Sequence, residues 1–369
     1  AEKYELIDNY RSKANIISIA NQWVSLIPKR LKDLPIVAMD KDSGSINIIQ
    51  HPTRHLITPL VQTIQQTDLV GSTCVLTKTN EEATQITGLL INNGYSAKLI
   101  QSNDGFNLYN LRELRYFTDL INLNSEIPTI SDEEWQAAKR SLNDIFQQSN
   151  KLEWCNLIIR EFELVNTARK YKSDWKTFLQ ESKFEDFMQI NGETIYVSTI
   201  HKAKGKEFNN VFLLLDNFDI SNNECKRQVY VAITRAKQNL VIHYNGRYLQ
   251  NLIADNLTYS IENYNYTPPP YISCLLTHKD VRLGYFESVQ NKISDVLSGS
   301  SLVFQPEGLA NNRGELILQF SNNFRETIHQ YNTRGYSISK AKANFIVYWH
   351  NKTTNQEVKI VLPELIFNK

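Results

Sequence analysis

The segment 201–207 holds a high density of polar side chains between two apolar runs. The runs Ile195–Thr199 and Val211–Leu215 are short and rich in β-branched residues, which predicts two buried strands of a parallel sheet. Open α/β sheets bind ligands beyond the carboxyl ends of such strands. We therefore expect a ligand at that edge, in contact with the polar residues His201, Lys202, Lys204, Gly205, Lys206 and Glu207.

Arg235 is a second candidate for binding a charged ligand. Apolar residues recur at helical spacing from Glu224 to Lys237, and Leu240–His243 reads as the next buried strand. An arginine near the end of that helix offers a planar group with five donors, which suits a phosphate. The alternative is a solvated arginine in a surface ion pair, and the lysines of 202–206 could equally form a solvated face.

Two stretches of sequence resemble known helicase motifs. T-I-H-K-A-K-G-K-E-F, at 199–208, and Q-V-Y-V-A-I-T-R-A-K, at 228–237, resemble the fifth and sixth motifs of UvrD/Rep-like superfamily 1 DNA helicases. Asp8-Asn9-Tyr10-Arg11-Ser12 looks like the fourth motif of that family. Val75-Leu76-Thr77-Lys78-Thr79-Asn80 resembles a strand-end element that touches single-stranded DNA. The four elements also follow the order found in the family.

The resemblance implies an ATP site built around arginines. Arg11 and Arg235 would reach the γ-phosphate, Glu207 would accept a hydrogen bond from the nucleotide sugar, and Gly205 would let the main chain come close. Arg11 could instead be a surface charge at a helix N-terminus, and Glu207 a first-turn glutamate favoured by the helix dipole.

The resemblance also implies a single-stranded DNA track, formed by Thr199, His201, Lys204, Lys78 and Asn80. His201 alone could equally be a core histidine with its hydrogen bonds satisfied. Family members commonly carry arginine where this chain has Lys78, so a bidentate clamp becomes a point charge there. DNA and 3′→5′ movement are what the family usually implies.

Parts of a nucleotide motor are missing from the sequence. It contains no G-x-x-x-x-G-K-[ST] loop and no strand that ends in a paired acidic motif, so neither the phosphate cradle nor the Mg²⁺ ligands can be identified. We expect a first RecA-like domain before Ala1 to supply both, and we expect the isolated chain to lack ATPase and unwinding activity. The alternative from another class is a non-enzymatic, helicase-like scaffold that binds DNA or a protein.

Composition sets looser limits. The 369 residues carry a net charge of only +1, so a nucleic-acid footprint must be local. The four cysteines are scattered, which argues against a zinc site and a disulfide framework, and we expect no metal held by this chain. No run approaches 18 apolar residues, and the sequence predicts a cytoplasmic location.

The pattern of expected strands and helices divides the sequence into domains. We predict an α/β, RecA-like parallel sheet from residues 1–102 and 191–263, with a short helical insertion at 103–190. A proline-rich linker at 264–271 leads to a small α+β, β-rich module at 272–369. Helices are expected at Leu249–Ala254 and Asp280–Leu297.

The C-terminal module fits no family, and its partner could be nucleic acid or a protein. A hairpin is expected around Phe345–Trp349 and Val358–Leu362. Glu357-Val358-Lys359 matches the E-x-K of a nuclease hairpin but lacks the preceding Pro-Asp pair. Four basic residues could meet phosphate or simply be solvated: Arg313, Arg334, Lys340 and Lys342.

Overall fold

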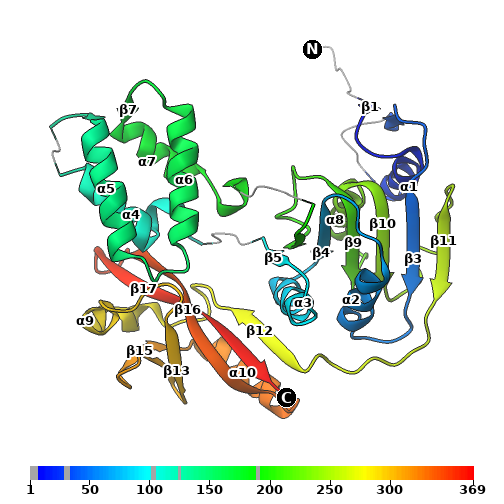
Figure 1. Ribbon diagram of the computed structural model, residues 1–369. Coiled ribbons are helices and arrows are strands. Elements are labelled where there is room, and N and C mark those ends of the chain that lie inside the picture. The colour runs from blue at the N-terminus through cyan, green and yellow to red at the C-terminus, as the bar shows by residue number, and fades with distance from the viewer. Residues whose placement is uncertain (1–6, 29–33, 101–104, 124–125, 188–191) are drawn as a thin grey trace. The chain divides into compact units, whose positions relative to one another are not determined.

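The computed structural model describes residues 7–28, 34–100, 105–123, 126–187 and 192–369 (Figure 1). The chain forms two compact units, one from Ala1–Ile100 with Gln189–Pro269 and the other from Gln101–Met188 with Pro270–Lys369. Each unit therefore combines two stretches that are distant in the sequence. The predicted domain boundaries at 102–103 and 190–191 lie outside the described residues.

A seven-stranded parallel sheet organises the first unit, in the order β11-β3-β10-β9-β4-β8-β5. This confirms the predicted α/β class with a parallel sheet. The central strands β4, β8 and β9 are buried almost throughout, as expected of a sheet covered on both faces. The strands are β3 (Ser45–Gln50), β4 (Thr73–Thr77), β5 (Ala97–Leu99), β8 (Ile195–Thr199), β9 (Phe208–Leu215), β10 (Ala236–Tyr244) and β11 (Leu257–Ile261).

Four helices cover this sheet. α2 (Ile57–Gln66) and α3 (Asn80–Asn92) pack together over β4, β8 and β9, and their apolar faces form one core cluster with those strands. α1 (Ala14–Ser25) and α8 (Asn223–Ile233) contact each other and β10 (Figure 1). A two-stranded parallel ladder, β1 (Asp8–Asn9) with β2 (Val37–Ala38), precedes and follows α1. Helix α3 ends at Asn92. Gly94, two residues further on, takes a φ of +84°, which glycine adopts at little cost and which turns the backbone out of the helix.

The helix predicted from Glu224 to Lys237 is too long by its last four residues. α8 ends at Ile233, and Ala236 is already the first residue of β10. The Ala236 position pairs with Phe208 of β9, so the sheet takes over the backbone there. The turn between helix and strand contains Arg235.

The helix predicted at Leu249–Ala254 is absent, and the strand β11 follows instead. Gln22 of α1 binds both backbone groups of Ile253, with Nε2 donating to its carbonyl at 2.6 Å and Oε1 accepting from its N–H at 3.1 Å. These bonds replace the ones a helix would have made. The edge position of β11, exposed on most residues, was not evident from its sequence.

Helices and short strands make up the first stretch of the second unit. α5 (Asp132–Ile145) begins with a capping box, in which Ser131 and Glu134 each bond to the other's backbone N–H. Phe117, Trp135, Phe162 and Trp175 meet in an aromatic cluster between the helices. The elements are η1 (Leu108–Asn110), α4 (Arg112–Ile121), β6 (Thr129–Ile130), α5 (Asp132–Ile145), α6 (Leu152–Val165), β7 (Lys170–Tyr171), α7 (Lys172–Glu181) and η2 (Phe184–Phe187).

A six-stranded antiparallel sheet makes up the second stretch, in the order β12-β17-β16-β13-β14-β15. The long β16–β17 hairpin contains the one predicted from the sequence. The elements are β12 (Tyr271–Leu275), η3 (Leu283–Ser288), α9 (Gln290–Ile293), β13 (Ser301–Gln305), β14 (Gly308–Ala310), β15 (Leu316–Gln319), α10 (Asn322–Thr333), β16 (Ser337–Asn351) and β17 (Gln356–Asn368).

The helical stretch and the β-rich stretch share one hydrophobic core. A single cluster of buried residues runs from Leu108 to Phe367 and includes both. Phe184 stacks on Phe345 of β16, with 5.5 Å between ring centroids. The sequence predicted an insertion and a separate C-terminal module, whereas the structure makes them one folding unit.

The helix predicted at Asp280–Leu297 is broken into η3 and the short α9. Val281 forms a β-bridge with Phe320, and the Arg282 N–H donates to the Gln319 carbonyl at 2.9 Å. These bonds hold the start of the segment in an extended form that excludes a continuous helix. α10 was not anticipated from the sequence.

Candidate functional site

The amino edge of the parallel sheet brings Glu207 and Arg235 together. Glu207 directly precedes β9, and Arg235 directly precedes β10. The Phe208 N–H donates to the Arg235 carbonyl at 3.0 Å, which sets the two strand starts side by side. Local pairing therefore places a carboxylate and a guanidinium next to each other.

The Arg11 segment is fastened to the same edge. The Asn9 Oδ1 accepts from the N–H groups of Arg11 and Ser12, each at 3.0 Å, which closes a tight turn. The buried Ser12 hydroxyl donates to the Ala236 carbonyl at 2.7 Å, and the Lys13 N–H donates to the Lys237 carbonyl at 2.9 Å. Arg11 is thereby carried to the neighbourhood of Arg235.

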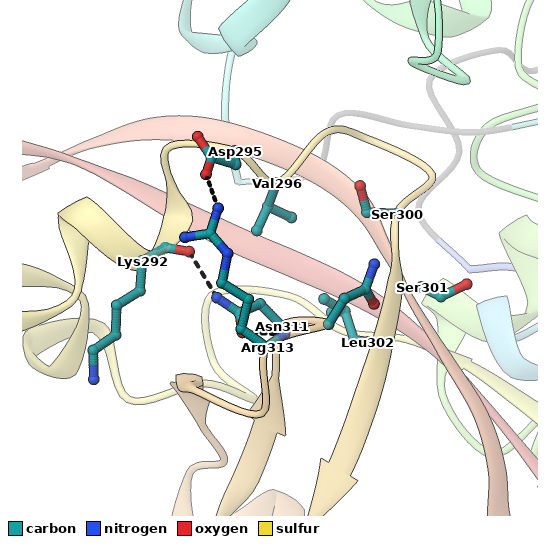
Figure 2. Close-up of a pocket in the computed structure, with 9 residues that line it drawn as sticks. Lys292, Asp295, Val296, Ser300, Ser301, Leu302, Asn311 and Arg313 are labelled. Carbon is teal, nitrogen blue, oxygen red and sulfur yellow. Dashed lines mark hydrogen bonds and ion pairs between the residues drawn. The ribbon is translucent and has the colours of Figure 1, made fainter.

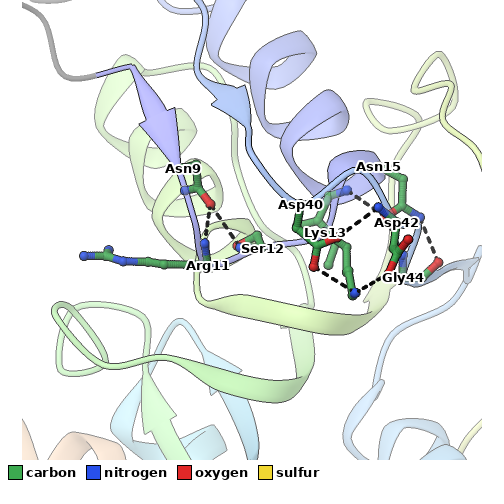
Figure 3. Close-up of polar contacts among 9 residues, drawn as sticks. Asn9, Arg11, Ser12, Lys13, Asn15, Asp40, Asp42 and Gly44 are labelled. Carbon is green, nitrogen blue, oxygen red and sulfur yellow. Dashed lines mark hydrogen bonds and ion pairs between the residues drawn. The ribbon is translucent and has the colours of Figure 1, made fainter.

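The Lys13 side chain takes no part in this edge. It forms ion pairs with Asp40 at 2.9 Å and Asp42 at 3.2 Å. Figure 3 shows Arg11 extending away from this group of charges. The Lys13 hydrogen bond lowers the pKa of the Asp40 carboxyl. Neighbouring basic residues of one short segment thus have different surroundings.

Glu207 stands between two cations. Its Oε1 lies 2.8 Å from Arg11 Nε, and its Oε2 lies 3.7 Å from Lys237 Nζ. The side chain of Glu207 is 21 % exposed, while that of Arg11 is 63 % exposed. With Arg235 beside them, three cations share one carboxylate, so the edge has a surplus of positive charge.

Arg235 is more firmly held than Arg11. Its Nε donates to the Val231 carbonyl at 3.1 Å, and its Nη1 donates to the Lys206 carbonyl at 3.1 Å. Burial lowers the pKa of the Arg235 guanidinium, the charge of Glu207 opposes that shift, and the charge of Arg11 adds to it. The group stays protonated in the physiological range because arginine starts so high. Arg235 therefore also has two structural roles. Its side chain caps the Val231 carbonyl in the last turn of α8, and it holds the Lys206 carbonyl of the connection before β9.

The expectation of one ligand edge for all of 201–207 is wrong. Thr199 ends β8 level with Thr77 at the carboxyl edge, whereas Glu207 precedes Phe208 at the amino edge. Because β8 and β9 both run parallel to β4, the chain between them must cross from one edge to the other. The polar residues are consequently divided between the two edges.

The carboxyl edge holds the residues predicted to contact DNA. The Ile200 N–H donates to the Thr77 carbonyl at 2.9 Å, and Lys202 Nζ donates to Asn80 Oδ1 at 2.8 Å. These bonds join the end of β8 to the start of α3. Lys78 is exposed, with its Nζ 5.2 Å from the centroid of the Phe218 ring.

The other predicted DNA contacts lie on the connection after β8. Thr199 is buried, with 7 % of its surface exposed, whereas His201 and Lys204 are exposed. Because His201 is exposed, it is not a core histidine. Its Nε2 lies 2.9 Å from the side-chain amide of Gln228 on α8. Gly205 has a φ of +86° and no atom within 4 Å of where a Cβ would stand. The constraint on Gly205 is therefore the backbone turn rather than crowding.

Sequence reasoning missed the roles of some residues at these two edges. Lys237 was visible in a quoted motif but had no assigned role, Lys202 was expected to contact a ligand and instead bonds to Asn80, and Ser12 was visible only as the residue after Arg11. A strand-end lysine and a serine beside an arginine are common, so their types alone carry little signal. Their placement depends on contacts between residues more than 100 positions apart.

Across the described ranges, no three His, Cys, Asp or Glu residues are arranged to hold a metal ion. The described helices also include none that is both long and apolar enough to cross a bilayer.

The first unit, with seven parallel strands and helices packed against them, fits a RecA-like fold, and the C-terminal stretch adds an antiparallel sheet. The family model of the UvrD-like helicase C-terminal domain matches residues 115–247, which include the motifs at 199–208 and 228–237. Residues 115–247 are therefore similar to a UvrD-like helicase C-terminal domain.

Among solved structures, the chain is similar to the C-terminal domain of a possible DNA helicase from Lactobacillus plantarum WCFS1. The TM-score is 0.31 and the sequence identity is 13 %, over 68 % of this chain and 98 % of the other. No curated protein matches the sequence.

Proposed function

We propose that this chain is the C-terminal half of an ATP-dependent DNA helicase or translocase. It supplies arginines to an ATP site completed by a first RecA-like domain, which holds Mg²⁺, and it forms part of a single-stranded DNA track. The observation that carries the proposal is the gathering of Arg11, Arg235 and Lys237 around Glu207 at one edge of the sheet.

The charge balance of that edge supports a polyphosphate ligand. Three cations against one carboxylate leave a surplus that a triphosphate would neutralise. Phosphoryl transfer depends on positive charge placed against the transferring oxygens, and bound ATP supplies the bond that is broken. Arg235, oriented by two backbone carbonyls, would stabilise charge on those oxygens, and the exposed Arg11 would add a second guanidinium.

The carboxyl edge supports the DNA part of the proposal. Lys78, Asn80, His201 and Lys204 offer exposed donors suited to phosphate oxygens, and Thr199 ends the strand beside them. The connection 200–206 runs from this edge to Glu207 at the other, so a shift at one edge would be passed to the other. This connection is the element we assign to coupling ATP hydrolysis with movement along DNA.

The test is Arg235→Ala in the full-length protein that contains both RecA-like domains. We expect the rate of DNA-stimulated ATP hydrolysis to fall by roughly 10³–10⁵, with the affinity for Mg-ATP much less affected. Arg227→Ala is the matched control, because Arg227 lies on α8, is half exposed and pairs with Glu224 at 3.6 Å. Arg11→Ala should also slow hydrolysis, and its exposure makes misfolding a poor explanation.

A hydrolysis rate in Arg235→Ala and Arg11→Ala equal to that of Arg227→Ala would overturn the proposal. Absence of DNA-stimulated hydrolysis in the unmodified full-length protein would favour the non-enzymatic scaffold. DNA-stimulated ATP hydrolysis by the isolated chain would contradict the assignment of the Mg²⁺ and phosphate cradle to another domain.

A further inference from the structure

The antiparallel sheet of the second unit opens where β13 leaves β16. β13 pairs with β16 only through Ser301 with Lys342 and Leu302 with Ala341, and its later residues pair with β14. A cavity of about 510 Å³ lies at this opening. Its lining includes Ser301, Ser339, Lys340, Lys342, Glu364 and Ile366.

The lysines of this cavity give it a positive rim. Lys340 and Lys342 are two positions apart on β16, so their side chains leave the same face. Lys342 Nζ lies 2.8 Å from Glu364 Oε2, which balances one charge. Lys340 is exposed and forms no ion pair with any described residue. One uncompensated cation therefore faces the cavity mouth.

A neighbouring cavity, lined by Lys292, Asp295 and Arg313, has the same formal charge balance. It measures about 190 Å³ and shares Ser301 and Leu302 with the larger one. The guanidinium of Arg313 is turned towards Asp295 there, with 2.7 Å between Nη2 and Oδ2 (Figure 2). This pairing neutralises Arg313 and leaves Lys292 as the unbalanced charge there, so the larger cavity differs from the smaller one in volume and not in net charge.

The charge of the surrounding sequence agrees with this local picture. Residues 270–369 contain 11 Lys and Arg against eight Asp and Glu, while residues 101–188 contain 11 against 15. The β-rich stretch is thus the basic part of an otherwise acidic unit. A basic, concave surface attracts a polyanion and raises its local concentration.

We propose that the cavity between β13 and β16 binds a nucleotide of single-stranded DNA, with Lys340 and Lys342 contacting its phosphates. The volume lies in the range of sites that enclose one compact ligand. Ile366, half-buried and paired with Lys340 across the hairpin, offers an apolar surface for a base or sugar, and the lysines stand on the rim. A groove with cations along its rim and an apolar floor matches a single strand better than an acidic peptide, which has no flat apolar base at each charge.

The test uses the full chain and a fluorescein-labelled oligothymidine, titrated at several salt concentrations. Lys340→Gln should weaken binding and make the slope of log K against log salt shallower by about 0.7, the contribution of one phosphate contact on a single strand. Lys352→Gln is the control, since Lys352 is exposed in the turn between β16 and β17 and the change in net charge is the same. Thermal melting should be alike for the two variants.

Glu364→Gln should change binding in the opposite direction. It frees Lys342 from its carboxylate partner and keeps an oxygen that can accept from the Ser273 hydroxyl, now 3.1 Å away. We expect tighter binding and a slope steeper by up to about 0.7. A structural role for Glu364 would instead lower the melting temperature without changing the slope.

Equal slopes for Lys340→Gln and Lys352→Gln would overturn the proposal. So would a loss of binding in Lys340→Gln that appears with a poly-glutamate probe and not with oligothymidine. Lys78→Gln, titrated in parallel, keeps this site distinct from the track of the first unit. If Lys78→Gln loses affinity for oligothymidine and Lys340→Gln does not, only the cavity proposal is rejected. If Lys340→Gln loses affinity and Lys78→Gln does not, only the single-stranded DNA track of the first unit is rejected.

Discussion

At the amino edge of the parallel sheet, three cations stand around Glu207, and the Arg11 side chain is largely exposed. In the second unit, Lys151 is only 3 % exposed, and its charge is met from several sides. Its Nζ donates to Asn344 Oδ1 at 3.0 Å and lies 4.3 Å from the centroid of the Phe345 ring. The charge of the buried Glu113 also favours the protonated form of Lys151.

The difference separates charge that is available to a ligand from charge that is used by the fold. Water screens the exposed cluster, so its internal pairs contribute little to stability and can be exchanged for a ligand. Burial makes Lys151 costly to charge and lowers its pKa to about 8, so its partners are needed to hold it. Lys151 belongs to the helical stretch and Asn344 to β16, and this contact joins the two halves of one core.

The largest expected effect follows from the buried charge. Lys151→Ala should lower the free energy of unfolding by about 3–5 kcal/mol, because it leaves buried polar partners uncompensated. Arg11→Ala should change it by less than about 1 kcal/mol. Urea denaturation followed by circular dichroism measures both.

Lys151→Met sharpens the same comparison. It keeps the length of the side chain without its charge, so it should cost less than Lys151→Ala. As pH rises from about 8 to 10.5, the wild type should also gain stability relative to Lys151→Met. In that range Lys151 is protonated in the unfolded chain and largely neutral in the folded one. Equal losses for Lys151→Ala and Arg11→Ala would erase the distinction between the two clusters.

A buried histidine pair extends the comparison to acid pH. His51 Nε2 and His243 Nδ1 are 3.0 Å apart at the carboxyl ends of β3 and β10, and both side chains are fully buried. Burial lowers the pKa of His51, while Glu262 and Asp216 oppose that shift. Burial, and then the charge of His51, lower the pKa of His243 to about 3. The His243 ring is therefore kept neutral in the fold at mildly acidic pH.

At His243 the folded state binds fewer protons than the unfolded state between about pH 6.5 and 3. Stability should therefore fall as pH falls through this window, by about 1.4 kcal/mol per pH unit for each histidine that stays neutral. His243→Leu should flatten the dependence, measured by denaturation at pH 7.5, 6.5 and 5.5. His329→Gln on α10, an exposed histidine, should leave it unchanged. An unchanged slope in His243→Leu would show that the pair does not control acid stability.

Ser12 gives a smaller effect at the exposed edge itself. Ser12→Ala removes the buried hydrogen bond to the Ala236 carbonyl and should cost about 1–2 kcal/mol. Ser18→Ala, on the exposed side of α1, is the control and should cost less than about 0.5 kcal/mol. If the two variants unfold at the same urea concentration, Ser12 does not fasten the Arg11 segment.

Sequence reasoning succeeded where the signal was local. Short apolar, β-branched runs predicted β8 and parts of β9 and β10. The resemblance to helicase motifs identified Arg11, Glu207 and Arg235 as candidates for one site, and in the structure these residues lie at the same edge of the sheet.

It failed where long-range contacts decide the outcome. The edge on which Glu207 lies depends on the crossover between β8 and β9, which no local pattern reveals. The break before α9 depends on the bridge from Val281 to Phe320. The single core of the second unit depends on contacts such as Phe184 with Phe345, whose partners are far apart in the chain.

The smallest expected change in stability comes with an informative change in binding. Glu207→Gln removes the one carboxylate among three cations, so stability should shift by less than about 1 kcal/mol. The affinity for inorganic tripolyphosphate should rise, because the surplus of positive charge grows, and the gain should shrink as salt is added. This probe has no sugar, so calorimetry at low salt reports charge alone and leaves the proposed sugar contact of Glu207 out of the measurement. Glu224→Gln, an exposed change on α8, should leave the affinity as it was. If both variants bind tripolyphosphate as the wild type does, the charges around Glu207 are no more available to a ligand than the charge of the buried Lys151.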